Sequence, residues 1–225
     1  MSIAEKLTTI AENQQKVYDA GYAAGQAEGG SNVLQYATNL DYLFNSATFP
    51  DGYELTINAP NFMENANRLV RFATGVKKVT LKGNTANNAA SLQYAFNSAQ
   101  SLKIVDASEW GAGGLKPTYF NNTFTDSRAL HTILGEIDCS ALVNVNSTFG
   151  GALALKEIRI KAGTLSRSFS FINSSLLSAE SIQSIVGGLA DLTGKDTQTL
   201  TLHANIVLTD DQKATISSKN WTLVQ

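Results

Sequence analysis

The chain has 225 residues and a formal net charge of −2, from 17 basic and 19 acidic side chains. Only 16% of the residues are charged, whereas Ser, Thr and Asn contribute 20, 21 and 19 residues. This composition argues against general nucleic-acid binding, which needs clustered positive charge, and against an acidic disordered tail. The 43% of hydrophobic residues are enough for the core of one elongated domain.

The N-terminal sequence lacks the apolar stretch after a basic start that marks a secretory signal. No segment approaches the roughly 18 uncharged apolar residues of a membrane-spanning helix. The single cysteine, Cys139, excludes an intrachain disulfide. We therefore expect neither a signal peptide nor a transmembrane segment, synthesis in a cytosol, and no membrane or nucleic acid among the partners.

Residues 3–24 predict a helix whose apolar positions recur at alternating intervals of four and three residues. That spacing is the seam of a helix that packs against copies of itself. A Gly-Gly-Ser segment at 29–31 ends the helix and provides a flexible joint. We expect residues 1–30 to oligomerise or dock, giving a homo-oligomer such as a trimer; a helix lying on its own domain is the alternative. The seam residues are Ile3, Leu7, Ile10, Gln14 and Val17.

Phenylalanines recur at nearly regular intervals through the middle of the chain. A small residue stands three positions after each of them, and an apolar strand pattern follows in most units. One such unit cannot bury its Phe alone, but stacked units build a continuous core with parallel strands side by side. The six anchors are Phe44, Phe72, Phe96, Phe124, Phe149 and Phe171.

The fullest unit contains Phe149, Ala152, Leu155, Ile158 and Ile160. This pattern resembles the BspA-like leucine-rich repeats over about residues 40–180. The resemblance implies a right-handed curved solenoid of the kind found in bacterial and phage proteins, often surface-exposed and adhesive. Members of that family usually carry Cys in the small position, where this chain has Ala, Ser or Gly.

The two ends of the chain show a second resemblance. Residues 4–21 and 181–223 resemble the ends of virion-associated proteins from phages and prophages of gut Firmicutes. The closing segment also suits a terminal cap: a helix at 179–191, a last strand at 200–202, and a capping box from Thr209 to Gln212 that opens a second helix. Trp221 and Leu223 would then cover the open end of the core.

The expected fold class is therefore α/β. It is a BspA-like leucine-rich-repeat solenoid with short parallel strands, a coiled-coil-like helix in residues 1–30, repeats in 31–178 and a capping unit in 179–225.

Sequence motifs for catalysis are weak. Residues 188–196 resemble a phosphate-binding loop, but the spacing is one residue too long and Asp196 stands where Ser or Thr is needed. His131 and His203 belong to different units and have no metal-ligand partner at useful spacing. Glu136 and Asp138 would share one side of a strand, where a solvated edge is favoured over acid–base chemistry. We expect no catalytic residue, metal or cofactor.

Basic residues form the main candidate binding site, because residues 68–82 carry five positive charges without an acid between them. A second group lies at 156–161. We expect a partly basic sheet face that binds an anionic glycan or a teichoic-acid-like polymer; solubilising charge is the alternative. Trp110, in a Gly-rich insertion, is expected either to be exposed for carbohydrate stacking or subunit contact, or to fold back onto the repeats. The candidate binding residues are Arg68, Arg71, Lys77, Lys78, Lys82, Arg159, Lys161 and Trp110.

Together these features favour a non-enzymatic virion structural protein of a phage or prophage, associated with the tail or a fibre. Its repeats would display a surface for host attachment or subunit contacts. The expected partners are the chain itself, other virion proteins, and a host-surface glycan or protein. A bacterial surface adhesin with the same repeats is the alternative, and a glycan-processing enzyme with paired carboxylates in a cleft is a third hypothesis.

Overall fold

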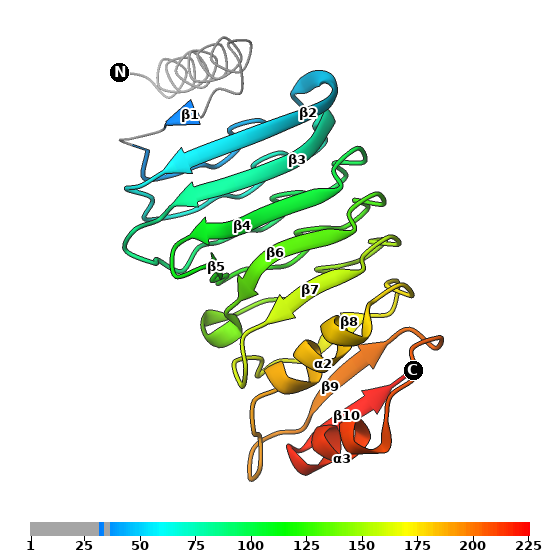
Figure 1. Cartoon of the computed structure of the whole chain (residues 1–225). Coiled ribbons are helices and arrows are strands. Elements are labelled where there is room, and N and C mark those ends of the chain that lie inside the picture. The colour runs from blue at the N-terminus through cyan, green and yellow to red at the C-terminus, as the bar shows by residue number, and fades with distance from the viewer. Residues whose placement is uncertain (1–31, 34–36) are drawn as a thin grey trace, which may run out of the picture.

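The computed structural model describes Asn32, Val33 and residues 37–225, which form a mixed α/β structure of mostly parallel strands (Figure 1). The predicted α/β class is confirmed. The predicted oligomerisation helix, with Ile3, Leu7, Ile10, Gln14 and Val17, lies outside the described residues.

The first sheet contains β1 (Asn32–Val33), β2 (Thr48–Ala59), β3 (Thr74–Gly83), β4 (Ile104–Trp110), β5 (Gly114–Leu115), β6 (Thr132–Ile137) and β7 (Glu157–Ile160). The second contains β8 (Phe169–Phe171), β9 (Gln198–Leu202) and β10 (Trp221–Val224), with helices α2 (Ala179–Gly188) and α3 (Asp210–Ser218) between its strands in the chain.

Every strand pair in the described chain is parallel. In the first sheet β1, β2, β3, β4, β6 and β7 follow one another, and β5 adds a short pairing to β6. The register places Thr56 of β2 beside Thr80 of β3, and Thr80 beside Asp106 of β4. Alternate residues such as Leu55 and Ile57 are buried on the inner side. The strand period of two thus separates a core side from an outer side of the sheet.

Behind this sheet runs a second ladder, made by residues 41–46, 67–72, 93–98, 121–126 and 146–151 (Figure 1). The amide of Phe44 donates to the carbonyl of Leu69 at 2.7 Å, and the amide of Val70 donates to that of Ala95 at 2.8 Å. Other amides bond backwards within their own segment, as from Ala47 to Phe44 at 3.1 Å. Backbone groups are therefore paired on both sides of the core. We call the outward side of these five segments the turn face.

Phenylalanine rings fill the space between sheet and ladder. The ring centroids of Phe96 and Phe124 lie 5.2 Å apart, those of Phe124 and Phe149 5.3 Å, and those of Phe149 and Phe171 5.1 Å, each pair stacked. Phe44 is buried as well. The sequence prediction of an inward Phe is confirmed at these five positions.

The prediction for Phe72 is wrong. The ladder hydrogen bonds align Phe44, Val70 and Phe96, so Val70 fills the core position and lies midway in the sequence between the two phenylalanines. Phe72 stands two residues later, at a positive φ of 58°, and is 45% exposed on the turn face. The valine is smaller, but it is fully buried and serves the same core position.

The helices and strands of the C-terminal region agree in outline with those predicted there. Helix α2 begins at Ala179, directly after the N-cap residue Ser178, and ends at Gly188, three residues earlier than predicted. Helix α3 opens with the predicted capping box of Thr209 and Gln212. The segment predicted as the last strand lies in β9, but Trp221 belongs to a further parallel strand, β10, and its indole Nε1 donates to the carbonyl of Ala190 at 2.9 Å.

Candidate functional site

Helix α2 takes the place beside β7 that a further strand would occupy, and its serines complete the hydrogen bonds of that strand. The Oγ of Ser181 accepts the amide of Ile158 at 3.0 Å, and the Oγ of Ser184 accepts the amide of Ile160 at 3.0 Å. Gly188 lets the helix approach closely, because a Cβ there would lie 2.4 Å from Ile160 Cγ2. The open edge of the first sheet is thereby covered.

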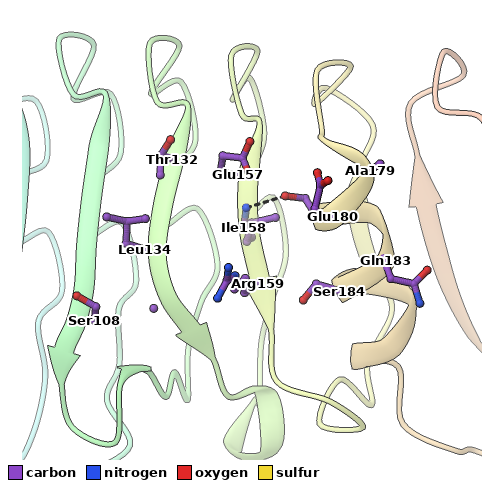
Figure 2. A pocket seen from close by; sticks show the side chains of 12 residues that line it. Ser108, Thr132, Leu134, Glu157, Ile158, Arg159, Ala179, Glu180, Gln183 and Ser184 are labelled. Atoms are coloured by element: carbon purple, nitrogen blue, oxygen red, sulfur yellow. Dashed lines mark hydrogen bonds between the residues drawn. The ribbon is translucent and has the colours of Figure 1, made fainter.

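The helix also forms one wall of an open groove of about 1080 Å³ on the outer side of the sheet. Figure 2 shows Leu134 on β6, Arg159 on β7 and Ser184 on α2 along this groove. Leu134 is 42% exposed, and Arg159 is exposed and forms no ion pair with a described residue. Glu157 and Glu180 supply negative charge to the same lining. The groove thus combines an exposed apolar side chain with charges of both signs.

The lysines of the sheet are paired with acids. Lys78 Nζ lies 3.0 Å from Asp106 Oδ2, and Lys82 Nζ lies 2.7 Å from Glu109 Oε1. Burial alone would raise the pKa of Asp106, but hydrogen bonds from Ser108 and Lys78 outweigh burial, so this pKa lies below its ordinary value. Carboxylates from the next strand therefore pair with these two lysines of the predicted basic sheet face.

A third predicted binding residue, Lys161, is also paired with an acid. Lys161 Nζ lies 2.9 Å from Asp138 Oδ2. That hydrogen bond and the charge of Asp138 raise the pKa of Lys161. Burial would raise the pKa of Asp138, but hydrogen bonds from Ser140 and Lys161 hold it below its ordinary value. Lys77 is exposed and lines a separate shallow hollow of about 320 Å³ together with Lys103 and other residues.

Trp110 does not form an exposed stacking site. It is 2% exposed, and its ring packs on Phe62 with centroids 4.8 Å apart. Of the two predicted positions, the structure selects the one folded back onto the repeats. Trp110 is thus a core residue and is removed from the candidate binding set.

Arg68 and Arg71 come together on the turn face with three aromatic rings. The Arg68 guanidinium carbon lies 5.0 Å from the Tyr42 ring centroid and 5.3 Å from that of Tyr94. The Arg71 guanidinium carbon lies 5.1 Å from the Tyr94 centroid and 4.3 Å from that of Phe72. We call these five residues the arginine–aromatic cluster. They come from three successive segments of the ladder, whereas Lys78 and Lys82 lie on the sheet.

Sequence reasoning missed the aromatic members of this cluster and the exposed Leu134. Tyr42, Arg68 and Tyr94 are evenly spaced in the sequence. Their spacing equals the interval at which the ladder hydrogen bonds align Phe44, Val70 and Phe96, so that alignment would have placed the three side chains in one row.

Other chemical groups are placed as follows. Burial raises the pKa of the Cys139 thiol to about 12, with a further contribution from the charge of Asp138. Among the described residues, no group of three or more His, Cys, Asp or Glu side chains is placed to hold a metal ion. Within that same part of the chain, no helix has both the length and the apolar character required to cross a membrane.

Comparison of the chain with protein-family models, curated proteins and solved structures gives no match.

Proposed function

We propose that the chain is a non-enzymatic virion structural protein of a phage or prophage, associated with the tail or a fibre. Its middle would be a BspA-like leucine-rich-repeat solenoid that displays a binding surface for host attachment or subunit contacts. The observation that carries this proposal is the groove between β6, β7 and α2, with Leu134 and Arg159 exposed in its lining.

The groove suits non-covalent contact with another protein. Its walls are a sheet and a helix whose positions are fixed by the hydrogen bonds of Ser181 and Ser184 to β7. A preformed surface loses little conformational entropy when a partner binds. Leu134 provides apolar area, and Arg159 provides a charged group of the type enriched at protein interfaces.

The ladder also supports the solenoid part of the proposal. Backbone hydrogen bonds join equivalent residues of successive units, such as Phe44 to Leu69 and Val70 to Ala95. The ring stack from Phe96 to Phe171 runs through several units. Successive units therefore share one core, as expected of a repeat array.

The decisive test is immunogold labelling of purified particles from a strain that carries this sequence. Label on the tail or a fibre is the expected result. Unlabelled particles with label on the bacterial surface would refute the virion proposal and favour the adhesin.

A second experiment tests the groove. We expect Leu134→Asp combined with Arg159→Glu to abolish binding of the purified chain to host cells or to virion proteins. Val207→Asp is the matched control, because Val207 is 88% exposed and lies outside the groove lining. Equal binding by both variants would exclude the groove as the contact surface.

A further inference from the structure

The turn face carries positive charge that no described residue neutralises. Among the described residues, no ion pair involves Arg68 or Arg71, although both side chains are half-buried. The carboxylate next to the cluster, Asp41, accepts the backbone amide of Asn67 at 2.6 Å instead. A half-buried guanidinium without a carboxylate partner is therefore ready to pair with an external anion.

Both arginines are held in place by the protein while donors stay free. Arg68 donates to the Tyr42 hydroxyl, and Arg71 Nε donates to Asn97 Oδ1 at 3.1 Å. No described residue accepts a hydrogen bond from the two terminal nitrogens of Arg71. Both guanidinium carbons lie within 5.3 Å of the ring centroid of Tyr94, so the charges are concentrated on one spot. A preorganised pair of this kind loses little side-chain entropy on binding.

Aromatic rings border these donors on the open side. Tyr42, beside Arg68, is 43% exposed, and Phe72, beside Arg71, is 45% exposed. A planar apolar surface beside forked cationic donors matches a ligand that has a flat apolar face and an attached anionic group. A sugar ring with a carboxylate or phosphate substituent has both properties.

We propose that the arginine–aromatic cluster binds a saccharide that carries an anionic group. Arg68 and Arg71 hold the anion through charge-assisted hydrogen bonds, and the rings of Tyr42 and Phe72 contact the sugar. This site is on the side of the molecule opposite the groove and does not depend on the virion assignment.

Binding of small probes to the full-length chain, measured by calorimetry at low salt, tests the proposal. The probes are trigalacturonate, glucose 6-phosphate, neutral maltotriose, inorganic phosphate and a ten-residue deoxythymidine oligomer. We expect the two anionic sugars to bind, and maltotriose and inorganic phosphate to bind at least roughly tenfold more weakly. The stronger of the two anionic sugars identifies the anion as carboxylate or phosphate. Affinity is expected to fall as salt is raised, because the site is partly exposed.

Variants separate the two parts of the site. Arg68→Gln and Arg71→Gln should each weaken trigalacturonate binding roughly tenfold. The matched control is Arg128→Gln, which removes an exposed arginine just after the 121–126 segment whose Nη2 already lies 3.4 Å from Asp126 Oδ1. Phe72→Ser, at an exposed position, should weaken sugar binding and leave inorganic phosphate binding unchanged.

Several outcomes would overturn the proposal: no binding of either anionic sugar, equal binding of maltotriose or inorganic phosphate, or tighter binding of the oligonucleotide. Equal losses in Arg68→Gln, Arg71→Gln and Arg128→Gln would also overturn it. Unchanged circular dichroism spectra and melting temperatures confirm that each variant is folded.

Discussion

Replacing Ser181 with alanine tests how the open edge of β7 is closed. The Ser181 hydroxyl accepts the amide of Ile158 at 3.0 Å and donates to the carbonyl of Lys156 at 2.9 Å. The Lys156 carbonyl keeps a second donor, the amide of Ser178 at 3.0 Å. The substitution therefore leaves one buried group, the Ile158 amide, without a partner.

The expected magnitude follows from two opposing effects. An unsatisfied buried amide costs about 1–3 kcal/mol. Alanine is the better helix former, which returns about 0.5 kcal/mol within α2. Ser181→Ala should thus lower the free energy of unfolding by roughly 0.5–2.5 kcal/mol.

Urea unfolding followed by circular dichroism measures this change, and hydrogen exchange reports the Ile158 amide directly. Ser217→Ala is the matched control, because the exposed Ser217 hydroxyl bonds only to carbonyls of its own helix α3. We expect the control to be neutral or slightly stabilising, with unchanged protection at Ile158. If Ser181→Ala were as stable as Ser217→Ala and the Ile158 amide stayed protected, the reasoning on edge closure would be refuted.

Three further predictions concern the core and the titratable groups. Phe124→Ala should lower the free energy of unfolding in urea by about 3–5 kcal/mol, because this buried ring stacks on two others. Phe72→Ala should change it by no more than about 0.5 kcal/mol, because Phe72 is exposed. Equal effects of the two substitutions would contradict the assigned register. The pKa of Asp138 is lower in the folded chain than in the unfolded chain. Between these two pKa values the unfolded chain binds more protons. Asp138 therefore contributes stability that is lost as pH falls through the folded pKa. Asp138→Asn should therefore flatten the loss of stability below about pH 4 in acid unfolding curves, and an unchanged curve would show that the carboxylate contributes nothing. Because its pKa is raised to about 12, the Cys139 thiol should resist a disulfide reagent at pH 8 in the folded protein and react on unfolding; rapid reaction of the folded chain would show that the thiol is accessible.

The parallel α/β arrangement and most of the Phe series were predictable because they depend on residue spacing alone. Phe96, Phe124 and Phe149 are large buried apolar residues, and the small residue three positions after each of them is buried as well. The register at Val70 was not predictable in the same way. Valine and phenylalanine both suit a buried position, and Phe72, two residues on, kept the aromatic series while breaking the true repeat interval.

The positions of charged side chains were harder to predict from the sequence than those of buried apolar side chains. Arg71 and Lys78 are seven residues apart in the sequence, but the chain passes from the turn face to the sheet between them. The acid that pairs with Lys78 is Asp106, which belongs to the next strand of the sheet. Likewise, Trp110 packs on Phe62, which is almost two units earlier. Contacts at such separations depend on how neighbouring units stack, and a local reading of composition does not contain that information.

On the turn face, residues with positive φ angles lower the stability of the fold but carry side chains of the proposed binding site. Arg68 and Tyr94 have φ values of 53° and 58°, a region that glycine enters freely and that costs other residues about 1 kcal/mol or more each. Selection for heat resistance alone would therefore favour glycine at these two positions and, with the same substitutions, erase the arginine–aromatic cluster. A variant stabilised by glycine at these two positions should therefore lose binding at the arginine–aromatic cluster, because the residues in this unfavourable backbone region carry side chains of that cluster.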